Sequence, residues 1–144
     1  MVGIAGLVLV QSSHELRNRY GEPDVERFAV QPGISLAVEY GSDHLICQAL
    51  IEPPRTLIHG EEPVPLMSSE AVTEILEDII PTEERGKIVQ ASTTNGCNEF
   101  QVLEYKSVSI TRSTHNCLPL KPEREVRATA VFKREACRKL KAAQ

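Results

Sequence analysis

The residues best suited to covalent chemistry are four cysteines and a histidine beside one of them. His115 lies two residues before Cys117, and residues two apart on a strand share a face, so an imidazole base next to a thiolate nucleophile is geometrically allowed. However, Pro119 and Pro122 follow, so no helix N-terminus is expected there to lower the pKa of the thiol. A cysteine-dependent hydrolase or transferase using Cys117 and His115 is therefore the alternative hypothesis.

The spacing of the cysteines favours disulfides over a metal site. Consecutive cysteines are 50, 20 and 20 residues apart, whereas zinc ligands come in pairs two to four residues apart, and there is no CxxC motif. An even number of cysteines fits an oxidising compartment. Four cysteines allow three pairings, and we rank Cys97 with Cys117 and Cys47 with Cys137 first.

Polar residues in the expected loops are the other candidates. His59, Glu61 and Glu62 lie in a proline-rich connector, where such a cluster is more often solvated surface than a metal site. We therefore expect no metal and no cofactor. Exposed rims are the best places to bind a partner, and the residues chosen there are Asp43, His44, His59, Glu61, Glu62, Arg112 and His115.

Composition limits the class of partner. A chain of 144 residues suits one domain, and its formal charge of −4 gives no global attraction to nucleic acid. Trp is absent and there are only three Phe and three Tyr, so stacking platforms for bases are scarce. The sequence has no glycine-rich phosphate loop, HExxH, GxSxG or EF-hand pattern. We expect another protein as the partner, and the oligomeric state stays open.

The first ten residues, MVGIAGLVLV, are apolar but too few to span a bilayer, which needs about 20. Two interpretations of residues 1–12 stay open. Their length suits the apolar centre of a secretory signal, but no Lys or Arg precedes Arg17, as in a truncated signal. The other interpretation is a buried N-terminal strand. The first predicts a secreted or periplasmic protein, and the second a cytoplasmic one.

Capping and turn residues divide the remaining chain. Ser12 and Glu15 form a capping box, and Gly21 ends that helix. Ser68 or Ser69 caps a second helix with an apolar stripe. Alternating apolar runs predict strands at 28–30, 34–40 and 45–51, on both sides of Asn95-Gly96, at 108–114 and at 125–132.

This order predicts an α+β protein of about seven strands and two to three helices. We expect two helix-plus-antiparallel-meander units, 13–52 and 68–144, joined by the proline-rich connector 53–67. Each unit would have its helix over its own sheet segment, as in a tandem repeat. The two units would still form one compact domain.

Pairing apolar residues predicts the strand registers. With 41–44 as the loop, Val38 faces Cys47, which points Cys47 into the core. The opposite face of that hairpin, with Ser35, Ala37, Glu39, Gln48 and Glu52, would be half solvated. A two-residue Asn-Gly turn pairs Ile88 with Leu103, and the next hairpin pairs Leu103 with Ile110.

The corner RYGEPD and the meander ending in VEYG resemble modules of small bacterial envelope proteins. Gly21, Pro23, Tyr40 and Gly41 carry this resemblance to assembly lipoproteins of the SmpA/OmlA type and to β-lactamase inhibitory proteins. The latter imply tandem helix-sheet repeats with disulfides. The chain has no lipobox cysteine and no inhibitory loop that can be matched, so neither anchoring nor inhibition is implied. The leading hypothesis is a secreted or periplasmic, non-enzymatic protein-binding or scaffold module.

Overall fold

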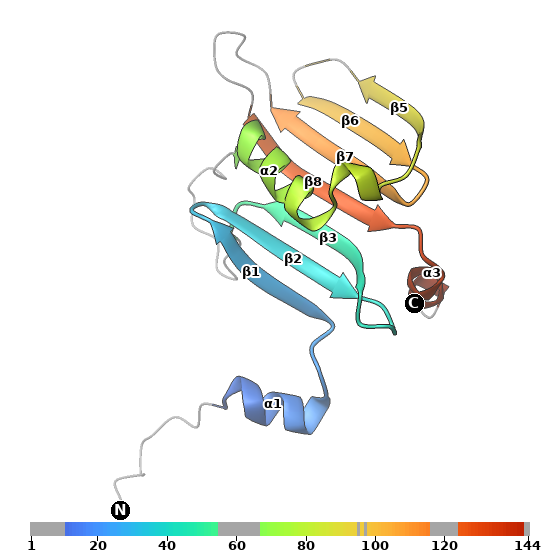
Figure 1. Ribbon diagram of the computed structural model, residues 1–144. Helices are drawn as coiled ribbons and strands as arrows, with labels where there is room; N and C mark the ends of the chain where they lie inside the picture. The colour runs from blue at the N-terminus through green and yellow to red at the C-terminus, as the bar shows by residue number, and fades with distance from the viewer. Residues whose placement is uncertain (1–10, 55–66, 95, 97, 116–123, 143–144) are drawn as a thin grey trace, which may run out of the picture.

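The computed structural model describes residues 11–54, 67–94, 96, 98–115 and 124–142. Within them the chain is an α+β protein with three α-helices, a short 3₁₀ turn at Thr82–Glu84 and an eight-stranded antiparallel sheet (Figure 1). The helices are α1 (Ser13–Tyr20), α2 (Ser69–Ile79) and α3 (Glu135–Ala142). The strands are β1 (Val25–Gln31), β2 (Ile34–Tyr40), β3 (Ile46–Glu52), β4 (Met67–Ser68), β5 (Ile88–Thr94), β6 (Asn98–Tyr105), β7 (Val108–His115) and β8 (Arg124–Phe132).

A single sheet includes strands from both parts of the chain. Its order is β1-β2-β3-β8-β7-β6-β5, and the short β4 pairs with β8. Strand β3 pairs with β8, with Leu50 opposite Thr129 and Ile51 opposite Ala128. The strands before and after α2 therefore meet at a β3–β8 seam in the middle of the sheet (Figure 1).

Helix α1 forms from local signals alone. The Ser12 hydroxyl accepts a hydrogen bond from Glu15 N at 3.1 Å, and the Glu15 carboxylate accepts one from Ser12 N at 3.4 Å, which is the predicted capping box. Gly21 ends the helix with a φ of 90°. No residue of α1 is buried, and α1 lies away from the sheet (Figure 1). The expectation that a helix covers each meander is therefore wrong for α1, which has too little apolar surface to pack.

Helix α2 covers one face of the sheet. Ser68 is its N-cap, since its hydroxyl accepts a hydrogen bond from Ala71 N at 3.1 Å. Val72, Ile75 and Leu76 are at most 3% exposed. They pack on apolar residues of β2, β3, β7 and β8, namely Ile34, Leu36, Val38, Ala49, Ile51, Val108, Ile110, Ala128 and Ala130. Each large side chain buried there contributes roughly 1.5–3 kcal/mol.

The β2–β3 register differs from the prediction by two residues. Val38 pairs with Ala49, not with Cys47, because the turn includes Leu45 and the register shifts next to Tyr40. Gly41 N donates to Leu45 O at 2.9 Å, and His44 closes the turn with a φ of 64°. A shift of two residues preserves the face of every side chain. Cys47 therefore still points into the core, where it is 1% exposed.

The β5–β6 register was predicted wrongly, whereas the β6–β7 register is confirmed. Ile88 pairs with Tyr105 instead of Leu103, with a bulge before Gln90. The reason is a wider turn than two residues, since the Thr94 hydroxyl accepts a hydrogen bond from Phe100 N at 3.1 Å. In the next hairpin, Leu103 pairs with Ile110 as expected.

Candidate functional site

The sheet face opposite α2 has no described helix over it (Figure 1), and we call it the open face. Alternate residues of each strand lie on it, and the strand registers align them in rows. One row contains Arg27, Ala37, Leu50, Thr129, Thr111 and Val102. The next contains Val25, Glu39, Gln48, Val131, Ser109 and Glu104. The open face therefore combines small, β-branched and charged side chains across six strands.

A shallow hollow of about 370 Å³ lies on the open face over β1, β2, β3 and β8. Val25, Leu50 and Val131 form its apolar lining, and Val25 and Val131 are 44% and 40% exposed. Arg27 and Arg127 also line it, with about half of each side chain exposed. The hollow thus offers apolar contact area next to two guanidinium groups.

Glu52 lies between these two arginines. Its carboxylate is 3.9 Å from Arg27 Nη1 and 3.6 Å from Arg127 Nε, distances longer than a charge-assisted hydrogen bond. A guanidinium has five N–H donors, so each arginine keeps donors for a ligand. Glu52 is 4% exposed, so the negative charge is enclosed while the positive charges reach solvent.

The expectation of a half-solvated outer face is wrong for three of its residues. Ser35, Ala37 and Glu52 are 8%, 7% and 4% exposed, whereas Glu39 and Gln48 are more accessible. Ala37 lies between the larger Arg27 and Leu50, Ser35 lies beside Glu52, and Glu52 is flanked by the two arginines. Alternation predicts which face of the sheet a side chain lies on, but not how far larger neighbouring side chains cover it from solvent.

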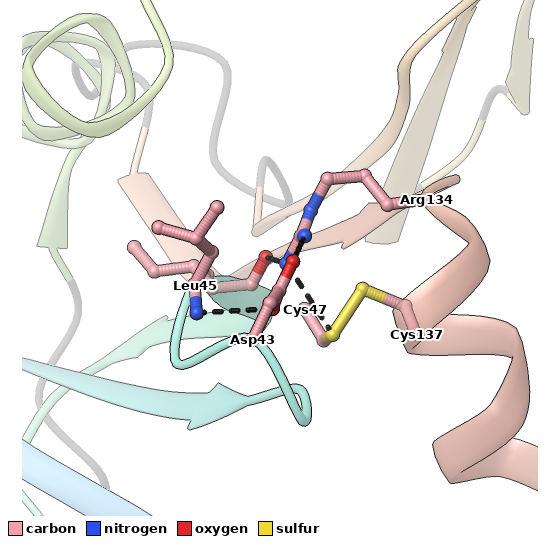
Figure 2. The surroundings of a disulfide bond; sticks show 6 residues. Asp43, Leu45, Cys47, Arg134 and Cys137 are labelled. Carbon is pink, nitrogen blue, oxygen red and sulfur yellow. Dashed lines mark hydrogen bonds and ion pairs between the residues drawn. A yellow bond between two sulfur atoms is a disulfide. The ribbon is translucent and has the colours of Figure 1, made fainter.

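Asp43, which was predicted as a rim residue for a partner, forms hydrogen bonds with other residues of the same chain. Figure 2 shows it beside Arg134 and the disulfide that joins Cys47 to Cys137, which is one of the two bonds in the pairing ranked first from the sequence. Asp43 accepts hydrogen bonds from Arg134 Nη1 and, at 3.1 Å, from Leu45 N. The hydrogen bond from Arg134 lowers the pKa of the Asp43 carboxyl. Asp43 therefore fixes the start of α3 to the β2–β3 turn, and its neighbour His44 is exposed.

Arg112 is not on an exposed rim, as the sequence suggested, but in a polar cleft of about 420 Å³ at the start of α2. Its side chain is 16% exposed. Its Nε donates to Glu125 at 2.7 Å, and its Nη2 donates to Ser69 O at 2.9 Å. These bonds give Arg112 a role in joining β7, β8 and α2. Asp43 and Arg112 thus contact different helices and do not form one site.

Several predicted residues lie outside the part of the chain that the structure describes: His59, Glu61, Glu62, Cys97 and Cys117. The backbone of His115 ends β7, opposite Asn98 and Arg124. Across the described ranges, no group of three or more His, Cys, Asp and Glu side chains is placed to hold a metal ion. None of the described helices is long and apolar enough to cross a membrane.

No family model, curated protein or solved structure matches this chain. Function must therefore be argued from the site itself. Arg27, Glu52 and Arg127 were not among the site residues predicted from the sequence. Alternation placed Glu52 on the outer face, but only the β3–β8 seam brings Arg127 next to it.

Proposed function

We propose that this protein is a non-enzymatic module that binds a partner protein on its open face. The observation that carries the proposal is the hollow in which half-exposed Arg27 and Arg127 stand beside exposed Val25 and Val131. Exposed apolar side chains next to arginine are typical of the centre of a protein interface.

The charges on the hollow indicate what the partner presents. Because Glu52 is enclosed, the accessible charges of the hollow are the two guanidinium groups and the single carboxylate of Glu39, so positive charge is in excess. Arginine binds carboxylates in a planar, often bidentate geometry. The partner therefore carries an acidic side chain flanked by apolar ones that contact Val25, Leu50 and Val131.

The dimensions of the open face suit a protein ligand. Its seven main strands have six spacings of about 4.8 Å, and strands of seven residues rise about 3.3 Å per residue, which gives a face of roughly 29 by 23 Å. This area approaches the roughly 800 Å² that one partner contributes to a standard interface. A flat sheet face can thus provide most of an interface without a deep pocket.

The proposed location is outside the cytoplasm, secreted or periplasmic. The disulfide between Cys47 and Cys137 supports this, because structural disulfides persist in oxidising compartments. A tandem repeat of helix-plus-meander units, as the envelope-protein resemblance implies, is part of the same proposal. It is supported by the order of one helix and three strands, then one helix and four, around β4.

A photo-crosslinking amino acid at position 131 tests the proposal in cells that express the protein. We expect Val131→p-benzoylphenylalanine to give a discrete crosslinked adduct, since this side chain lines the hollow and is 40% exposed. The same residue introduced at Glu74, on the exposed side of α2, is the matched control and should not give that adduct.

Charge removal then tests the role of the arginines. In the Val131 crosslinking background, Arg27→Gln with Arg127→Gln should abolish the adduct, whereas Arg138→Gln on α3 should not. The double variant removes two charged neighbours of Glu52, which could weaken the fold. The melting temperature of each variant is therefore measured to show that it is folded. An adduct that persists in a folded double variant, or that forms equally well from position 74, would refute binding on the open face.

A further inference from the structure

The two sulfurs of the disulfide differ in access. Cys47 lies on β3 and is 1% exposed, whereas Cys137, in the first turn of α3, is partly exposed. Cys47 Sγ also packs against the backbone of Gly41, where an added Cβ would lie only 2.7 Å from the sulfur. Cys137 is therefore the half of the disulfide that is more open to a reagent from solution.

The two sulfurs also differ in electrostatic surroundings. Arg134 Nη2 donates a hydrogen bond to Cys47 Sγ at 3.6 Å and another to Ile46 O at 2.8 Å (Figure 2). A nearby guanidinium stabilises a thiolate and so makes that sulfur a better leaving group. The enclosed sulfur is thus the one with a cation directly beside it.

We propose that Cys137 is a thiol-exchange site for low-molecular-weight thiols, with Cys47 as the leaving group. A thiolate attacks Cys137 Sγ, a new S–S bond forms between the reagent and Cys137, and the bond between Cys137 and Cys47 breaks. Its electron pair stays on Cys47 as a thiolate, which Arg134 stabilises and which takes a proton from water. No net oxidation occurs, because one disulfide is exchanged for another.

One feature of α3 acts in the opposite sense. The helix N-terminus stabilises a thiolate on Cys137, which would favour Cys137 as the leaving group. However, that outcome requires attack on Cys47, and the burial of Cys47 against Gly41 prevents it. Access therefore decides the direction of exchange, and Arg134 sets its rate.

Asp43 moderates the effect of Arg134. Its carboxylate pairs with Arg134 Nη1, so part of the positive charge beside Cys47 is neutralised. The groups that face Cys47 Sγ thus form an ordered series of carboxylate, guanidinium and sulfur (Figure 2). Exchange would break the covalent link between α3 and β3, while the contact between Asp43 and Arg134 would still hold the start of α3 to the β2–β3 turn.

Peptide mapping identifies the attacked sulfur. The full-length oxidised protein is incubated with reduced glutathione, quenched with acid, alkylated with N-ethylmaleimide and digested with trypsin. Trypsin places each cysteine in its own peptide: 28–55 for Cys47, 88–106 for Cys97, 113–124 for Cys117 and 135–138 for Cys137. We expect the first adduct on peptide 135–138, with the alkylated thiol on peptide 28–55. An adduct that appears first on peptide 28–55 would overturn the proposal.

Substitutions at Arg134 and Asp43 test the leaving-group role. Arg134→Gln should slow formation of the Cys137 adduct several-fold, because the Cys47 thiolate loses the cation beside it and a thiol of higher pKa leaves more slowly. Arg134→Lys should restore most of the rate. Asp43→Asn should accelerate exchange, because the charge of Arg134 is no longer partly neutralised.

Arg138→Gln is the matched control, since it removes one exposed positive charge from α3, just after the position of Arg134. It should leave the rate unchanged. Hydrogen exchange of the α3 amides shows whether a variant has loosened the helix. Thiol exchange that is faster in Arg134→Gln than in the wild type would remove Arg134 from the mechanism. Thiol exchange that is slowed equally in Arg138→Gln would do the same.

Discussion

Arg85 is a buried guanidinium that joins α2 to the opposite half of the sheet. It is 7% exposed, its Nε donates to Ile80 O at 2.9 Å, and its Nη2 lies 2.9 Å from Glu77. Its charge also lies 5.4 Å from the ring centre of Tyr105. The planar guanidinium of Arg85 thus contacts three different partners at once, which a lysine side chain cannot do.

We expect Arg85→Ala to lower the free energy of unfolding by about 2–3 kcal/mol, because it leaves the Ile80 carbonyl without its donor and removes a stacked cation. Arg85→Lys should recover only part of this loss. Glu77→Gln should cost less, since Glu77 is 44% exposed. Urea titration measures all three variants. Equal stability of Arg85→Ala and the wild type would contradict this role.

Glu104 makes the stability of the protein depend on pH in the acid range. The hydrogen bond from Lys133 Nζ, at 2.5 Å, and a second from Ser109 lower the pKa of the Glu104 carboxyl. The stability from this group is therefore fully present above the unfolded-state pKa of about 4.3 and is lost as pH falls through the native-state value. We expect the urea midpoint of the wild type to fall more steeply below about pH 4.3 than that of Glu104→Gln. Lys133→Met should flatten the curve similarly, and parallel curves would disprove the assignment.

At the scale of elements, α1 and α2 are both N-capped by a serine but differ in packing. Leu16 of α1 is 43% exposed and Leu76 of α2 is 3% exposed. We expect Leu76→Ala to cost about 2–5 kcal/mol and Leu16→Ala less than about 0.5 kcal/mol. Chemical denaturation of the two variants compares the same substitution in both helices. A large loss for Leu16→Ala would show that α1 packs on the protein after all.

The elements were predictable where their signals are local. The capping box at Ser12, the cap at Ser68 and the alternating runs locate helices and strands, because capping and alternation act within a few residues. Registers were less predictable. A side-chain hydrogen bond at Thr94 and a left-handed residue at His44 widened two turns, and neither leaves a sequence pattern as strong as Asn-Gly.

At the scale of the whole molecule, the candidate site depends on pairing that the sequence does not display. Arg27 comes from the first edge strand and approaches Glu52 across β2, whereas Arg127 comes from the last strand and approaches Glu52 only because β3 pairs with β8. This pairing joins segments almost 80 residues apart. The choice of β8 as the partner of β3 depends on the core as a whole, because Ile51 and Ala128, which pair at the seam, are at most 1% exposed. The open face could therefore be predicted strand by strand but not as a site.

The same seam predicts that the described strands unfold as one unit. Tyr40 in β2 and Tyr105 in β6 both pack against a single core that continues across β3 and β8, so the loss of either half removes apolar contacts from the other. Fluorotyrosine labelling followed by ¹⁹F NMR in urea should give these two residues the same midpoint. Tyr20, 74% exposed on α1, should report little change and serves as the control. Separate midpoints for Tyr40 and Tyr105 would instead indicate two independently stable units, and the seam would then contribute far less to stability than its burial implies.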